Sequence, residues 1–344
     1  MTTARDMGND PDDLDEMKRR YDEEKAVGPR IVRCGFIEGR GEKAAASKVT
    51  AETEDEARAG VDFYAKRGYV QMKIYNSMRP ELVPVIAREA HARGMRVSGH
   101  VPVHLRAEEV VRAGYDEIQH VNMLFLNFFV DKDTDTRTPL RFILVAEKAA
   151  GLDLASPRVN DFTRLLVEKK TVIDPTLTVF EELFENRLGE LGPSYKAVAG
   201  RLPVMVRRGL YAGSLPIPDG KDQLYKDSFA ATLRLVRKLH DAGVPVLSGT
   251  DAIPGFALHR ELELHAAAGI PNADVLREAT LGAAQVMRMD KHTGSIAPGK
   301  DADLIVVDGD PLANISEIRR VVRTVRGGVS YEPAALLESV GVLP

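Results

Sequence analysis

Short apolar runs alternate with longer amphipathic stretches along most of this chain. Apolar runs of strand length occur at 30–36, 70–76, 95–101, 116–121, 171–179 and 244–251. The stretches between them repeat apolar residues at helical spacing, as in 53–68, 79–94 and 104–114. Regular alternation of strands and helices is typical of parallel strands joined by crossover helices. The pattern therefore predicts an α/β protein built on a parallel sheet.

The pattern changes near the end of the chain. From residue 291 onward it consists of short apolar runs and turns rich in Gly, Pro and Asp, as in GSIAPGKDADLIVVDGDP. This predicts a small β unit at 291–344 after an α/β body at 1–290. Two connections within the body, 122–170 and 180–243, are unusually long, and both contain helical patterns. We interpret them as elaborated loops over a site.

Composition and charge narrow the classes of partner. The 47 basic and 51 acidic residues leave a net charge of −4, and no basic cluster with aromatics occurs, so no nucleic-acid partner is expected. No apolar run is long enough to predict a membrane span. The first residues lack the apolar core of a signal peptide, so this chain alone predicts a cytoplasmic protein. The single cysteine, Cys34, excludes intrachain disulfides and cysteine-based zinc sites, and we expect it to be buried and inert.

Four side chains stand at or near the carboxyl ends of apolar runs: Lys73, His100, His120 and Asp251. In parallel α/β barrels, these strand ends form the active face. Each residue alone has an ordinary explanation, such as a hydrogen-bonded histidine, a helix-capping aspartate or a surface lysine. These explanations do not account for four such residues at the same level of the sheet, because residues of these types are rarely buried without a partner. Imidazole and carboxylate are usual ligands of zinc-like ions, so the set predicts a metal site.

Residues near these strand ends are candidates for substrate contacts. Tyr75 points to the same side of its strand as Lys73, and contact with substrate or plain packing explains it equally well. His259 follows Asp251 closely enough to line a pocket, although a role at the start of its own helix is the main alternative. Arg260 and Glu261 are expected to serve that same helix end.

Two further histidines are expected to lie outside the metal site. His104 follows His100 by four residues, but the intervening VPV breaks the helix that a His-x3-His metal site requires. We therefore expect a loop or supporting role for His104. His265 falls on the apolar face of its helix and is expected to be structural.

The strand-end set identifies a resemblance to a known family. Lys73, His100, His120 and Asp251, with GTDA and the tail GSIAPGKDADLIVVDGDPL, resemble the metal-dependent amidohydrolase superfamily over essentially the whole chain. The segment MKIYNS is most similar to the branch that contains Xaa-Pro dipeptidase-like and imidazolonepropionase-related enzymes. The resemblance implies a TIM-type (β/α)8 barrel with a small β-sandwich domain. It also implies hydrolysis of an amide-type C–N bond in a dipeptide, small cyclic amide or lactam.

The resemblance implies a role for each residue of the set. Lys73 would carry a carbamate that bridges two divalent metals, with zinc as the expected ion. The chemistry is reasonable, because an amine must be neutral to add carbon dioxide and burial beside metals favours that state. His100 and His120 would bind the second metal and Asp251 the first. Asp251 would then take a proton as metal-bound hydroxide attacks, and deliver it to the leaving amine.

One part of the family pattern is missing from this chain. The family carries a His-x-His pair on its first strand, whereas no two of the eight histidines here are separated by a single residue. The segment TTARDMGND resembles the family's second strand instead. We therefore expect an amino-terminally truncated member, lacking the first barrel strand and part of the β-sandwich, and an export signal could have been lost with them. Such a chain should bind at most one metal and have little turnover. Its open ladder edges favour association, so a homo-oligomer is one expectation.

Two alternatives remain open at this stage. A deaminase of the same superfamily shares these ligands, but its mononuclear members generally lack the bridging lysine, so Lys73 favours the hydrolase. A non-catalytic binding protein, or a subunit that needs a partner chain, belongs to a different class. The joint presence of Lys73 and Asp251 weighs against simple decay of a dead site.

Overall fold

The computed structural model of this protein describes residues 1–343, and it divides into two compact units. We call residues 3–145 and 155–173 the sheet unit, and residues 1–2, 146–154 and 174–343 the helical unit. The predicted boundary at residue 290 is a different division of the chain, because it separates a barrel from a small β unit. That boundary stays a prediction.

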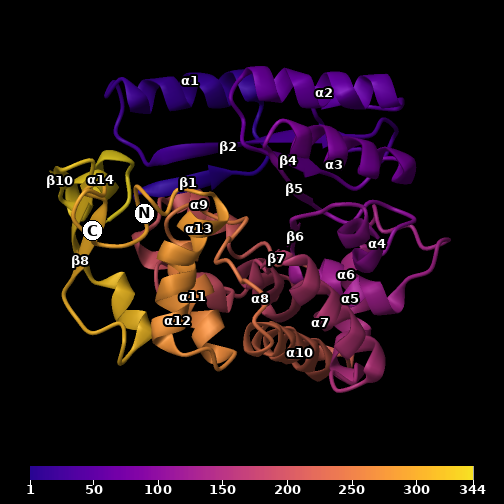
Figure 1. Cartoon of the computed structure of the whole chain (residues 1–344). Coiled ribbons are helices and arrows are strands. Elements are labelled where there is room, and N and C mark those ends of the chain that lie inside the picture. The colour runs from indigo at the N-terminus through magenta and orange to yellow at the C-terminus, as the bar shows by residue number, and fades with distance from the viewer. Residues whose placement is uncertain (344) are drawn as a thin grey trace. The chain divides into compact units, whose positions relative to one another are not determined.

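The sheet unit contains a seven-stranded parallel sheet with helices between its strands (Figure 1). The strands are β1 (Thr3–Asp6), β2 (Arg30–Glu38), β3 (Val49–Thr50), β4 (Gln71–Ile74), β5 (Arg96–Gly99), β6 (Glu117–Gln119) and β7 (Val172–Asp174). The helices are α1 (Pro11–Asp22), α2 (Glu54–Lys66), η1 (Pro80–Leu82), α3 (Val83–Ala92), α4 (Ala107–Arg112), α5 (Val121–Phe129) and α7 (Pro157–Lys169). The strand order is β1-β2-β4-β5-β6-β7, and β3 pairs with β2. This is the arrangement of a partial TIM-type barrel, so the predicted fold class is confirmed.

Apolar side chains on the strands and on three helices hold the sheet unit together. The helices α1, α2 and α3 cover one face of β2, β4 and β5 (Figure 1). Ile37, Met72, Ile74 and Ile118 are completely buried. Burying a side chain of this size contributes about 1.5–3 kcal/mol each. Cys34 is also buried as predicted, and burial raises the pKa of its thiol to about 12, so it is inert.

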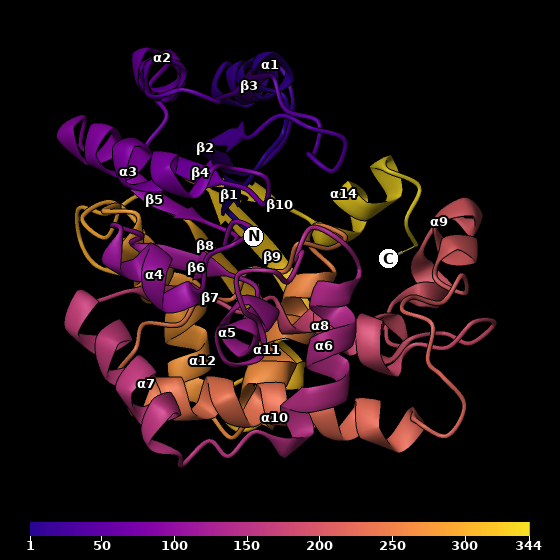
Figure 2. The same cartoon turned by 90° about the vertical axis from the view of Figure 1, so that its right-hand side faces the viewer.

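The helical unit contains one long helix, Asp222–Asp241, and three of its other helices pack against it. Its helices are η2 (Ala149–Gly151), α8 (Leu177–Glu185), η3 (Pro193–Tyr195), η4 (Ala199–Arg201), α9 (Val204–Gly209), α10 (Asp222–Asp241), α11 (Ala257–Ala267), α12 (Asn272–Arg277), the π-helical turn η5 (Glu278–Gly282), α13 (Ala283–Val286), η6 (Ile315–Arg319) and α14 (Pro333–Ser339). The long helix α10 contacts η2, α8 and α11 (Figure 2). Helix α6 (Leu140–Lys148) spans the boundary between the units. No helix within 1–343 has the length and apolar character needed to cross a membrane.

The predicted small β unit near the carboxyl end is confirmed. Strands β8 (Leu304–Val307), β9 (Val321–Arg326) and β10 (Val329–Tyr331) form an antiparallel sheet in the order β10-β9-β8. Several of its apolar side chains, including Val306, Val322 and Val329, are exposed.

Two predicted strands differ from the structure. The run 171–179 is a strand only over Val172–Asp174, and its remainder begins helix α8. The run 244–251 was predicted as a strand, which is wrong: it forms a single bridge residue at Val246. A physical reason is visible at Gly249, whose N–H donates to the Asp174 carboxylate at 2.8 Å and is therefore not available to a strand ladder.

A buried network of two carboxylates and one imidazole holds the start of α8. Glu261, completely buried on α11, accepts the N–H groups of Leu177 and Thr178 at 2.7 Å each. His265, one turn later, lies between Glu261 at 3.4 Å and Glu278 at 2.9 Å. His265 is thus structural, as predicted. Glu261 serves the start of α8 rather than of its own helix, which corrects the expectation for that residue.

Arg260 needs the same correction. Its guanidinium makes a two-pronged ion pair with Glu181 of α8, at 2.5 and 2.9 Å, and also contacts Glu263. The first turn of α11 therefore stabilises another helix through both residues. The reason is packing. Helix α11 lies against α8, so the polar side chains on this face of α11 contact α8 rather than the end of α11.

The His265 network predicts a loss of stability at alkaline pH. Burial alone would lower the pKa of His265, but Glu261 and Glu278 outweigh it and raise that pKa from 6.5 to about 9. Because the pKa is higher in the folded state, the stabilisation is complete below pH 6.5 and is lost as pH rises through 9. We expect the free energy of unfolding of the wild-type protein to fall by on the order of 2 kcal/mol across this range. Urea denaturation at each pH measures it.

Two variants check that His265 is the source of this pH dependence. His265→Gln should be less stable at pH 6.5 and should lose most of the decline toward pH 9. His292→Gln, at an exposed histidine, should keep the wild-type decline. An unchanged decline in His265→Gln would assign the effect to another group.

Candidate active site

Three of the four strand-end residues come together in the sheet unit. Lys73 lies in β4, His100 follows β5 directly, and His120 follows β6 directly. These strands are neighbours in the sheet, with Lys73 paired in register with Ser98 of β5. All three side chains are buried, with exposed fractions of 6%, 5% and 7%. Polar side chains of these types at such low exposure need partners or a function.

The rings of the site contact one another. The ring centroids of His100 and His120 are 4.5 Å apart with the planes nearly perpendicular, at 89°. Tyr75 packs on the other side of His100, with a centroid distance of 4.0 Å. The Lys73 ammonium nitrogen lies 5.5 Å from the centroid of the Tyr75 ring. Lys73, Tyr75, His100 and His120 therefore form one cluster, which we call the strand-end cluster; Tyr75 is its one partly exposed member.

Gly99 allows this close approach of β5 to β4. Its φ is +147°, and a Cβ atom added there would lie 2.0 Å from the Ile74 carbonyl oxygen. Any side chain at this position would push apart the two strands that carry Lys73 and His100. The residue just before His100 must therefore be glycine for the cluster to form.

His100 has one ring nitrogen bonded and the other unbonded. Its Nδ1 lies 2.9 Å from the Asn76 side-chain oxygen, which can only accept, so Nδ1 carries the proton. Its Nε2 is buried and has no hydrogen-bond partner among the described residues. Burial lowers the pKa of His100 well below its usual value, with smaller contributions from His120 and Lys73, so the imidazole is neutral. A neutral, oriented imidazole with a free lone pair is the state that binds a metal ion.

Glu38 holds the loop that carries Tyr75 and Asn76. This completely buried carboxylate ends β2 and accepts backbone N–H groups of Gly39 and Ser77, both at 2.8 Å, and of Ala45 at 3.2 Å. Burial raises the pKa of Glu38, and these hydrogen bonds oppose the rise. Sequence reasoning missed Glu38 and Asn76. The strand-end position of Glu38 was a usable signal, since it ends an apolar run as His100 does.

The fourth predicted residue, Asp251, belongs to the helical unit. It is exposed in a bend and has a φ of +46°, a left-handed conformation that Asp tolerates better than most residues. The Asp174–Gly249 hydrogen bond holds the loop just before it, and a Cβ atom on Gly249 would lie 2.2 Å from the Asp174 carboxylate. Convergence of Asp251 with Lys73, His100 and His120 stays a prediction.

The remaining sequence candidates have separate environments. His259 is partly buried at the start of α11, where burial lowers its pKa to about 4. Its contact with substrate stays a prediction, as does that of Tyr75. His104 lies in a loop, and its Nδ1 is 2.7 Å from the Lys132 carbonyl oxygen, which agrees with the expected loop role.

The geometry allows a metal site but does not complete one. Among residues 1–343, no group of three or more His, Cys, Asp and Glu side chains is placed to hold a metal ion. The strand-end cluster supplies two imidazoles, and Lys73 adds an oxygen ligand only if it is carboxylated. The partnerless, buried Nε2 of His100 is nevertheless the donor that a metal needs, so the residues present are compatible with one ion.

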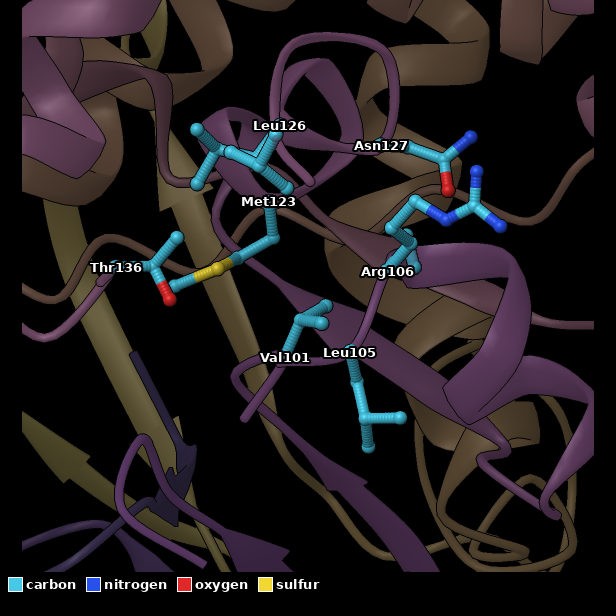
Figure 3. Close-up of a pocket in the computed structure, with 9 residues that line it drawn as sticks. Val101, Leu105, Arg106, Met123, Leu126, Asn127 and Thr136 are labelled. Carbon is cyan, nitrogen blue, oxygen red and sulfur yellow. The ribbon is translucent and has the colours of Figure 1, made fainter. Parts of the chain in front are cut away.

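The sheet unit also contains a small cavity, and one of its lining residues, Val101, directly follows His100 (Figure 3). It is lined mainly by apolar side chains, among them Val101, Leu105, Met123 and Leu126. Its volume of about 10 Å³ is room for a single water molecule at most. This cavity is too small to be a substrate site.

Part of this chain matches a known family, and several solved structures share its fold. Residues 206–330 match the model of the amidohydrolase family. No curated protein is similar enough to count as a relative. The predicted resemblance to the amidohydrolase superfamily is confirmed by this match together with the solved structures that share the fold.

Three of these structures illustrate the likeness. A bottromycin amidohydrolase is 19% identical with a TM-score of 0.70, covering 100% of this chain and 75% of its own. A Xaa-Pro dipeptidase with bound methionine in its active site is 20% identical with a TM-score of 0.66, covering 96% and 75%. Ochratoxinase from A. niger is 19% identical with a TM-score of 0.66, covering 96% and 72%. At these identities the likeness concerns the fold alone.

Proposed function

We propose, from the amidohydrolase match over residues 206–330 and the shared fold, that this chain is a metal-dependent hydrolase of amide-type C–N bonds. The observation that carries the metal dependence is the state of His100. The Nε2 of this buried, neutral imidazole has no hydrogen-bond partner among the described residues. Burying such a nitrogen costs free energy unless a ligand binds to it. Dipeptides or small cyclic amides are the proposed substrates, which the dipeptidase among the similar structures supports.

Each residue has a proposed task. Lys73, as a carbamate, would hold a divalent ion together with His100 and His120, and zinc is a usual ion for imidazole and oxygen ligands. When bound, such an ion polarises a carbonyl and eases deprotonation of water near neutral pH. Asp251 would accept a proton from the attacking water and return it to the leaving nitrogen. Asn76 would keep His100 in the tautomer that exposes Nε2.

The residues also set a limit on what this chain does alone. No His-x-His pair occurs in the sequence, so a second ion would have Asp251 as its main protein ligand. Three protein ligands are the usual minimum for a catalytic ion. We therefore propose that the 344-residue chain holds at most one ion and turns over slowly.

Metal analysis and a hydrolysis assay test this proposal together. The purified chain is incubated with Zn²⁺ and bicarbonate, dialysed, and assayed for bound metal by mass spectrometry. We expect no more than one Zn²⁺ per chain, and trace release of amino acid from Xaa-Pro dipeptides. Absence of any bound ion would contradict the metal-dependent assignment. Two tightly held ions with rapid turnover would contradict the proposed limit, and ammonia release from amidine-type bases would favour a deaminase.

A further inference from the structure

Arg141, near the start of α6, is a largely buried cation without an acidic partner. Its Nη1 lies 3.5 Å from the Thr136 carbonyl oxygen, and its guanidinium carbon lies 4.6 Å from the centroid of the Phe142 ring. Its Nε is buried and has no hydrogen-bond partner among residues 1–343. Burial lowers the pKa of Arg141, and no carboxylate is among the groups that offset this effect. A guanidinium nevertheless stays charged in proteins.

Other partly buried arginines of the sheet unit are paired with acids. Arg5 is held by Glu117 at 2.6 Å, Arg33 by Asp15 at 2.6 Å, and Arg137 by Asp135 at 2.9 Å. Removing a charge from water costs several kcal/mol, and a nearby opposite charge normally offsets that cost. Arg141 lacks this compensation among the described residues, although it lies only four positions from Arg137. Its charge is thus not neutralised by an acidic side chain of the described residues.

Arg141 interacts electrostatically with residues of the strand-end cluster. Its positive charge is one of the groups that keep the pKa of His100 low, and the phenol of Tyr75 is the group that acts on Arg141 in turn. Thr136, whose carbonyl contacts Arg141, lines the small cavity together with Val101, the residue after His100 (Figure 3). The cation therefore lies within electrostatic range of the residues proposed to carry the chemistry.

We propose that Arg141 recognises a carboxylate on the substrate, so that the preferred substrates are amides with a free carboxylate, such as N-acyl amino acids and dipeptides. A guanidinium matches a carboxylate with two parallel hydrogen bonds, and its partnerless Nε–H can supply one of them. Burial strengthens such a pair, because water does not compete with the anion. The proposal rests on the proposed hydrolase function and makes Arg141 a specificity residue of that site.

Binding of a charged ligand and of its neutral analogue tests this proposal. The zinc-treated chain is titrated calorimetrically with N-acetyl-L-proline and with N-acetyl-L-prolinamide, which lacks the charge. We expect the acid to bind at least about tenfold tighter, since charge-assisted hydrogen bonds are worth about 1.5–3 kcal/mol. Arg141→Gln should lose this preference and bind the amide as the wild-type chain does. Arg141→Lys should keep part of it, because the charge remains but the paired geometry does not.

Controls separate recognition from folding and from the proposed function. Arg137→Gln removes a neighbouring arginine that is already paired, and it should keep the wild-type preference for the acid. Thermal melting and bound zinc should be the same in Arg141→Gln as in the wild-type chain. Equal binding of acid and amide by the wild-type chain, no binding of either, or a preserved preference in folded Arg141→Gln would each overturn the proposal. An Arg141-dependent preference in a chain that binds no metal would uphold Arg141 and refute the metal-dependent function.

Discussion

Replacing His100 by alanine is expected to lower the affinity of the chain for Zn²⁺ by about 100-fold or more. Disturbing a group that merely supports a metal ligand already costs about 10–100-fold, and His100 is proposed as the ligand itself. Its Nε2 is buried and has no hydrogen-bond partner among the described residues. The hydrogen bond from Nδ1 to Asn76 leaves Nε2 unprotonated, so its lone pair can bind a metal ion. Competition with a coloured zinc chelator at neutral pH measures the affinity.

His104→Ala is the matched control. His104 is four residues further along, is exposed, and is bonded through Nδ1 to the Lys132 carbonyl oxygen. It should leave the zinc affinity unchanged. If both variants bind zinc as the wild-type chain does, zinc is bound elsewhere and the strand-end cluster is not a metal site.

Replacing Glu261 by alanine is expected to reduce the free energy of unfolding by about 3 kcal/mol, because a buried charged network loses one member. The carboxylate accepts two backbone N–H groups at the start of α8 and the hydroxyl of Thr178 at 2.6 Å. Without it these donors are buried and unsatisfied, and His265 keeps only Glu278. Urea denaturation at neutral pH measures the loss, together with amide hydrogen exchange at Leu177 and Thr178.

Glu54→Ala provides the comparison for Glu261→Ala. Glu54 lies in the first turn of α2 and pairs with Arg58 in an exposed ion pair. Such pairs contribute about 0–1 kcal/mol, so this variant should be nearly as stable as the wild-type protein. A similar small loss in Glu261→Ala, with unchanged exchange at α8, would show that water replaces the carboxylate there.

The sheet unit was largely predictable because its strands are short apolar runs bounded by polar residues. The runs at 30–36, 70–76, 95–101 and 116–121 all contain strands. The run at 171–179 was predicted as a single strand because an apolar segment of this length is compatible with either a strand or a buried helix. Its second half follows Pro175 and becomes α8, whose first N–H groups are satisfied by Glu261. That partner is more than 80 residues away, and no local pattern indicates it.

The part of the candidate site that lies at the ends of strands was predictable from the sequence. Lys73, His100 and His120 meet because β4, β5 and β6 are neighbours and parallel. Asn76 and Glu38 escaped prediction because their roles depend on contacts between loops, and an Asn in a loop usually signals only a turn. Arg141 escaped for a different reason: an unpaired charge is visible only when the positions of all neighbouring acids are known.

The strand order of the sheet unit has a consequence for how the protein folds. From β1 to β7, apart from the short β3, each strand pairs with the one that precedes it along the chain. Except for the long connection between β6 and β7, each pairing joins parts of the chain that are near one another in sequence, which limits the entropy lost on closing the loop. During synthesis each new strand therefore finds its neighbour already outside the ribosome. We expect the sheet to grow in one direction as the chain emerges, with His100 and His120 joining Lys73 before the helical unit has been translated.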